Sequence, residues 1–198
     1  MTTEPGLERP TDADSFRAAW AVAEAEWDQT FARARGFSAE QLHERVDGEW
    51  SFIQTQRHLV FATDAWVRRA LLGDPTPWHP LDLPHDDMDD QPGVPRDYAA
   101  RPTLDEVLAL RADRMSTVRE VIAGLTDEAL DTMTVPVLEP GYPESEAFLV
   151  RRCVGAVVSE ERAHRTFAER DLDLIQSRSS IRSRSRAAAQ RGAEPTHG

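Results

Sequence analysis

Apolar residues recur every three or four positions over long stretches of this chain, and this periodicity constrains the fold more than any other feature. It is clearest over residues 14–35, where Phe16, Trp20, Trp27 and Phe31 fall on one helical face. No stretch alternates apolar and polar residues convincingly, as a half-buried strand would. We therefore predict an all-α protein with long helices near 14–35, 50–72, 103–123 and 146–175, and short helical segments near 39–45 and 126–130.

Capping and loop signals indicate where these helices begin and end. Thr103 and Glu106 have the spacing of a capping box, in which each side chain bonds the backbone N–H of the other residue. A glycine follows each of the first three long helices, as is typical of helix ends. Residues 73–102 contain seven prolines and little periodicity. We predict a four-helix bundle with a long crossover loop between helices 2 and 3.

The two ends of the chain differ in composition from the middle. Residues 1–12 are predicted to be a disordered N-terminal lead, and residues 13–176 to form the helical bundle. Residues 177–198 are rich in Ser, Arg and Ala, with five arginines and one acid, a composition that cannot bury a core. We predict a disordered, solvated tail there; the alternative is a weak contact with an acidic partner or with nucleic acid.

The chain is acidic, with 35 acids against 23 bases and a formal net charge of −12. Because nucleic-acid binding needs a basic surface, we expect no nucleic acid on the main domain. No apolar run reaches the roughly 18 to 20 residues that span a bilayer, and residues 1–14 lack the apolar segment of a secretory signal. We expect a cytoplasmic protein without a membrane partner.

Cys153, the only cysteine, lies among valines and is predicted to be a small core residue.

The last predicted helix carries two polar residues within its apolar stripe. Glu160 and His164 continue, at helical spacing, the stripe that includes Cys153 and Val157. Side chains four residues apart lie about 5 to 6 Å from each other, so a carboxylate oxygen and an imidazole nitrogen there could bind one ion. This donor pair suits zinc, iron, nickel or manganese. The alternative is an ordinary Glu–His pair at the solvent edge. Glu161 is expected to point about 100° away and to be solvated.

A third ligand is expected from another helix, and His58 is the best candidate. It lies within the second predicted helix and is followed by the apolar residues Phe61, Ala62 and Ala65. A lone histidine on such a face is often a core residue. However, inward polar residues on facing helices are how bundle cores build metal sites. Three protein ligands would leave positions open for water or substrate, which is the pattern of catalytic metal sites.

The remaining polar candidates rank lower. His43 is expected at the surface, and His79 and His85 in the long loop without a role in the site. The acidic run 86–90 lacks the spacing and the glycine of an EF-hand, so a solvated acidic loop is predicted. Arg57, or an arginine of the long loop, is a candidate to pair with a carboxylate on a bound small molecule.

On these motifs the chain resembles the DinB-like superfamily, which includes mycothiol-dependent maleylpyruvate isomerase and bacillithiol transferase-like proteins. The resemblance covers roughly residues 13–175 and is carried by Trp50-Ser51 opening a helix, His58 eight residues after Trp50, and Ser159-Glu160-Glu161-Arg162-Ala163-His164. It implies a four-helix bundle and a divalent metal held by three side chains. Many members use three histidines, whereas the mycothiol-dependent isomerase uses histidine, glutamate and histidine. The latter pattern falls on His58, Glu160 and His164.

The resemblance implies a metal-dependent low-molecular-weight-thiol (mycothiol-type) S-transferase or isomerase that acts on a small electrophile. The metal would be zinc, with nickel, iron or manganese as alternatives, and the thiol would be a co-substrate. No catalytic base can be assigned from the sequence. One alternative is a non-enzymatic metal- or ligand-binding stress-response module, and another is a bundle whose Glu and His are structural. The expected partners are the thiol and the electrophile, and a homodimer is left open.

Overall fold

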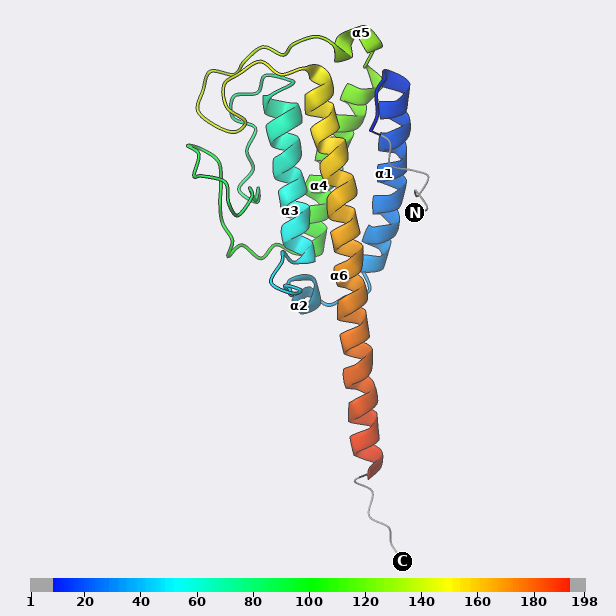
Figure 1. The fold of residues 1–198 in the computed structure, drawn as a ribbon. Helices are drawn as coiled ribbons and strands as arrows, with labels where there is room; N and C mark the ends of the chain where they lie inside the picture. Colours follow the sequence, from blue (N-terminus) through cyan, green and yellow to red (C-terminus); the bar gives the residue numbers. More distant parts are fainter. Residues whose placement is uncertain (1–8, 193–198) are drawn as a thin grey trace, which may run out of the picture.

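The computed structural model describes residues 9–192, and the side chains of residues 9–181. Four long helical stretches make up most of it (Figure 1). Residues 9–192 contain no strand, and the one β-bridge joins Met133 to Leu149. The protein is therefore all-α, as predicted. The elements in chain order are α1 (Ala13–Ala34), α2 (Ala39–Leu42), α3 (Phe52–Thr63), the π-helix η1 (Asp64–Arg69), α4 (Leu104–Ala123), α5 (Asp127–Leu130) and α6 (Val150–Gly192).

The long helices pack side by side around a common core. α3 packs against α4 and α6, and α1 packs against the same two helices. In Figure 1, α1 and α6 run in one direction, and α3 and α4 run in the other. Because α3 and α4 are parallel, the connection between them returns along the outside of α3 (Figure 1). The core between the helices includes Trp20, Trp27, Leu59, Val118 and Val157.

Side-chain caps fix where the helices begin. Asp12, Ser38, Ser51 and Thr103 each accept a hydrogen bond from the backbone three residues on, and that third residue bonds back to the cap, so that each is a capping box. Such caps satisfy backbone N–H groups that have no partner inside the helix. The predicted box of Thr103 and Glu106 is confirmed.

The second long helix changes character along its length. It begins as an α-helix and continues over Asp64–Arg69 as a π-helix. The buried carboxylate of Asp64 accepts two hydrogen bonds of 2.8 Å from Arg114 of α4. Periodicity alone did not reveal this wider turn, because its apolar spacing still fits an ordinary helix.

The last helix differs from its prediction at both ends. It begins at Val150 rather than near residue 146, because the preceding backbone pairs instead with residues 132–134: the Thr134 N–H donates to the Phe148 carbonyl and the Val150 N–H to the Thr132 carbonyl. It continues through Gly192, so residues 177–192 are helical where a disordered tail was predicted. Between Gly155 and Gly192 there is no glycine or proline, and arginine and alanine are good helix formers. Residues 1–8 and 193–198, also predicted to be disordered, lie outside the described residues.

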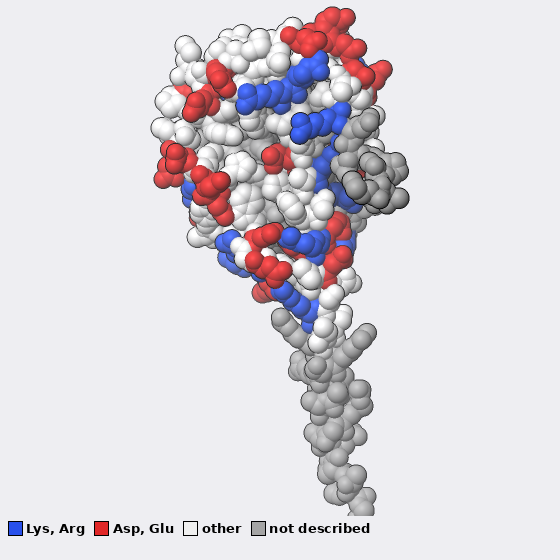
Figure 2. Space-filling view, in the orientation of Figure 1, with Lys and Arg blue, Asp and Glu red and all other residues white. Residues whose placement is uncertain are grey.

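Many charged side chains lie on the surface of the protein, and its single cysteine lies in the core. On the face shown in Figure 2, acidic and basic side chains are interspersed around a broad uncharged area. Cys153 is fully buried, and burial raises the pKa of its thiol to about 11, which confirms it as a core residue. None of the described helices combines the length and apolar character needed to cross a bilayer.

Candidate metal centre

His58 is held in one orientation by its surroundings. It lies on α3 and its side chain is fully buried. Its Nδ1 lies 2.9 Å from the Leu83 carbonyl oxygen in the long connection. A carbonyl can only accept, so Nδ1 carries the proton and Nε2 presents a lone pair. This backing of one imidazole nitrogen by a carbonyl is the arrangement that orients histidines toward metals.

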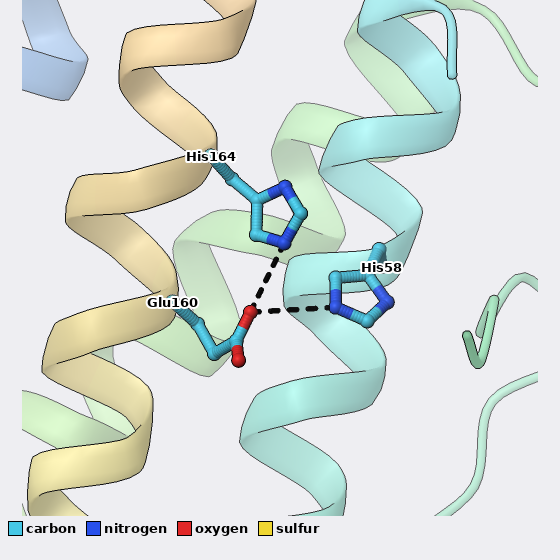
Figure 3. Close-up of side chains that lie close together, drawn as sticks. All are labelled: His58, Glu160 and His164. Atoms are coloured by element: carbon cyan, nitrogen blue, oxygen red, sulfur yellow. Dashed lines mark ion pairs between the residues drawn. The ribbon is translucent and has the colours of Figure 1, made fainter. Parts of the chain in front are cut away.

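Glu160 and His164 approach His58 from α6, one helical turn apart (Figure 3). The Glu160 Oε2 atom lies 3.0 Å from His164 Nε2 and 3.5 Å from His58 Nε2. The Glu160 side chain is 31% exposed and that of His164 16%, so the cluster is closed on the α3 side and open on the other. The structure thus brings together all three predicted ligands.

The atoms at the centre of this cluster fit a cation. One donor atom from each of His58, Glu160 and His164 lies within 4.8 Å of the others, close enough to share one ion. The buried His58 Nε2 has no hydrogen-bond partner, and its lone pair faces a carboxylate oxygen. Two acceptors that face each other across 3.5 Å repel, and a positive ion between them would remove the repulsion. The set of two nitrogens and one oxygen suits zinc and its neighbours.

The charge states of the cluster agree with this geometry. Burial lowers the pKa of His58, and the nearby His164 and His85 lower it further, so that the ring is neutral at physiological pH. The hydrogen bond from His164 and the nearby His58 ring hold the pKa of Glu160 well below its usual range. A neutral imidazole and an ionised carboxylate are the forms that bind metals.

A buried ion pair beside the cluster sets the register of the helices that carry it. Arg111 of α4 donates to both carboxylate oxygens of Glu161, at 2.9 and 2.6 Å, and to Gln56 of α3 at 3.2 Å. These bonds join α3, α4 and α6 within one turn of the candidate ligands. The prediction that Glu161 is solvated is wrong, because its side chain is buried against Arg111 of α4 rather than in water.

Arg57 also has a different role from the one considered for it. It is buried, and its guanidinium donates to the carbonyls of Leu81, Asp97 and Ala100. It therefore fastens the two ends of a loop segment, and its donors are used on backbone rather than on a small molecule.

The remaining histidines fall in different places. The ring of His43 bonds the Pro102 carbonyl, and His79 accepts from the Leu81 N–H, both away from the cluster. His85, by contrast, lies beside the cluster, with its ring centroid 4.6 Å from that of His58.

Sequence reasoning missed the residues that surround the histidines. The ring centroid of Trp50 lies 4.6 Å from that of His58 and 6.0 Å from that of His164. The Trp50 Nε1–H donates a hydrogen bond of 2.9 Å to Asp86. A pocket of about 310 Å³ borders Trp50, Asp86 and His164. Nothing in the local sequence signals that residues 85 and 86 meet residues 50 and 58, because an irregular loop joins them.

The fold and the cluster define a class: all-α proteins in which facing helices bring two histidines and a glutamate together as a potential metal site. The sequence model of the DinB superfamily matches residues 23–168, most of the chain. The protein belongs to the DinB superfamily. No curated protein and no solved structure matches the chain significantly.

Proposed function

We propose that this protein is a DinB-type four-helix bundle that holds one divalent metal through His58, Glu160 and His164. We further propose that it is a low-molecular-weight-thiol (mycothiol-type) S-transferase or isomerase acting on a small electrophile. The observation that carries the proposal is the buried, unpartnered Nε2 of His58 opposite the Glu160 carboxylate. A structural histidine in a core would be expected to find a donor or acceptor for both ring nitrogens.

The chemistry follows from the number and kind of ligands. Three protein ligands leave coordination positions free, and the cluster is open on the side of Glu160 and His164. A bound divalent metal would lower the pKa of a coordinated thiol and so favour the nucleophilic thiolate. His58, Glu160 and His164 act here as ligands, and the hydrogen bond from His58 to the Leu83 carbonyl keeps the ring in its binding orientation.

Zinc is the first candidate for the metal, because two imidazoles and a carboxylate form a typical catalytic zinc set. Nickel, iron and manganese accept the same donors. The chemistry of the donor atoms thus limits the class of ion, and metal analysis identifies the ion itself.

Thiol consumption by the metal-loaded protein tests the proposed activity. In the presence of small electrophiles, wild type should consume mycothiol or a simpler thiol as the thioether forms, if it is an S-transferase. If it is an isomerase, it should form an isomerised product only when the thiol is present, and the thiol is regenerated. His58→Ala should lose both bound metal and turnover, whereas His43→Ala, a histidine outside the cluster, should keep both. Unchanged metal content and turnover in His58→Ala would exclude the proposal. Binding of metal and thiol with no product from any electrophile would favour the alternative, a non-enzymatic metal- or ligand-binding module.

A further inference from the structure

Residues 83–86 of the long connection make three contacts beside the candidate metal site, two with His58 and one with Trp50. The Leu83 carbonyl accepts from His58 Nδ1 at 2.9 Å. Two residues on, the ring of His85 lies 4.6 Å from the ring of His58. Asp86 then accepts the 2.9 Å hydrogen bond from Trp50 Nε1. Residues 83–86 therefore form an outer wall of the site, opposite α6.

The indole of Trp50 completes this wall. It precedes the cap of α3, and its ring is tilted by 46° against His58 and stacks within 17° on His164. It therefore contacts one candidate ligand from each of the two helices. Trp50, Asp86 and His164 also border the same pocket of about 310 Å³. The indole thus lies where a small molecule in that pocket would meet His164.

The segment 83–86 is fixed at its base, and at its tip the Asp86 carboxylate binds the indole of Trp50. Arg57 fastens Leu81 on one side and Asp97 and Ala100 on the other, which closes the segment between them into a loop. Beyond this base, the Leu83 carbonyl accepts from His58, and the Asp86 carboxylate accepts from Trp50 and interacts with Tyr98. The neighbouring Asp87 is exposed.

We propose that Asp86 is a positioning residue: its hydrogen bond to Trp50 holds the indole against His58 and His164 and so controls access from the pocket to the metal. The inference rests on the proposed metal site. Loss of the bond frees the indole, and water or a chelator then reaches the site more easily. The free energy of one hydrogen bond to a charged group corresponds to roughly a tenfold change in a rate or an equilibrium constant. We therefore expect metal release to change by about tenfold.

Four variants separate the bond from other effects. Asp86→Ala removes the acceptor, and Trp50→Phe removes the donor while keeping an aromatic ring. Asp86→Asn keeps an oxygen acceptor and loses only the charge. Asp87→Ala removes a neighbouring exposed charge and is the matched control. Each is loaded with zinc, and zinc release to a chromophoric chelator is followed by stopped flow. In parallel, acrylamide quenching of the metal-free proteins reports the exposure of Trp50, whose emission is identified by the loss in Trp50→Phe.

We expect Asp86→Ala and Trp50→Phe to release zinc about tenfold faster than wild type, and the double variant to be no faster than either single variant. Asp86→Asn should stay within about threefold, and Asp87→Ala should match wild type. In Asp86→Ala the quenching of Trp50 should rise. Equal release rates and equal quenching in Asp86→Ala and Asp87→Ala would overturn the inference. If wild type takes up no zinc, the proposed function fails, and the quenching comparison still decides whether Asp86 positions Trp50.

Discussion

Among the buried side-chain atoms that lack a hydrogen-bond partner in the described part of the chain, two face a neighbouring carboxylate. His58 Nε2 faces the Glu160 carboxylate, and Asp82 Oδ1 lies beside the carboxylate of Asp64. An unsatisfied buried polar group costs about 1–3 kcal/mol. At His58 a metal ion would satisfy the lone pair. At Asp82 a proton would do so, because a protonated carboxyl can donate to Asp64.

The state of Asp82 predicts a specific pH dependence of stability. Burial raises the pKa of Asp82 well above 3.8, and the negative charge of Asp64 raises it further, against the opposing effects of Arg114 and the His79 N–H. A group whose pKa is raised on folding stabilises the protein fully below the unfolded pKa. That stability is lost as pH rises through the folded pKa. We therefore expect the unfolding free energy of wild type to fall, relative to that of Asp82→Asn, as pH rises from about 4.

Chemical denaturation of both proteins at several pH values between about 4 and 8 measures this difference. Asp87→Asn, which changes an exposed acid of the same loop, is the control and should show a constant difference from wild type. A constant difference between wild type and Asp82→Asn over the same range would mean that Asp82 is ionised in the folded protein.

At this scale the sequence predicts the inward-facing polar residues better than their partners. Glu160 and His164 interrupt an apolar stripe, and this irregularity is visible without a structure. The burial of Glu161 depends on Arg111, which lies 50 positions earlier and looks like any other helical arginine. Long-range charge pairing leaves no local pattern, so neither this pair nor the contacts of Arg57 could be predicted.

Among the helices, a buried polar connection joins α3, α4 and α6 through Gln56, Arg111 and Glu161. Both charged side chains are fully buried, and the guanidinium also lies 5.7 Å from the ring centroid of Trp27. Removal of one partner leaves a buried charge unpaired, which is far more costly than the loss of a surface pair. The connection therefore fixes the rotation of α6 that points Glu160 toward α3.

Glu161→Ala should lower the unfolding free energy by about 3–5 kcal/mol, because it strands the Arg111 charge in the core. Thr166→Ala, an exposed change on the same helix, should cost less than about 0.5 kcal/mol. Urea denaturation followed by circular dichroism measures both values. A cost for Glu161→Ala no larger than that of the control would show that Arg111 has another partner or access to water.

Over the whole molecule, α6 extends well beyond the helices that it packs against (Figure 1). Its described side chains are buried as far as Ile175, and Arg178 still pairs with Glu44 and Asp47 near α2. Ile181 is already 64% exposed. The packed part of the protein thus ends between Arg178 and Ile181.

A chain that ends at Ile181 should unfold with the same free energy as the full chain, within about 0.5 kcal/mol. A chain that ends at Leu172 lacks the buried Ile175 and should lose about 2–5 kcal/mol. Thermal and urea unfolding of the three proteins provide the comparison. A large loss of stability in the longer truncated chain would show that residues 182–198 pack against the body.

At the scale of the molecule, apolar periodicity and caps predicted the long helices, because both are local properties of the chain. The positions of Thr103 and Glu106 even predicted the start of α4 to the residue. The path of the long connection was not predictable, since it depends on single contacts such as Arg57 with the Leu81 carbonyl. The extent of α6 was missed because low hydrophobicity indicated disorder, whereas helix propensity continued to Gly192.

The central claim, that His58, Glu160 and His164 hold a metal, is tested most directly by metal analysis. Inductively coupled plasma mass spectrometry is applied to untagged protein purified without chelator, and to Glu160→Ala and Glu144→Ala prepared in parallel. Glu144 is an exposed acid outside the cluster. We expect about one divalent ion per chain in wild type and Glu144→Ala, and a large loss in Glu160→Ala. A wild-type protein without stoichiometric metal, or a Glu160→Ala variant that retains it, would show that these three residues do not hold a metal.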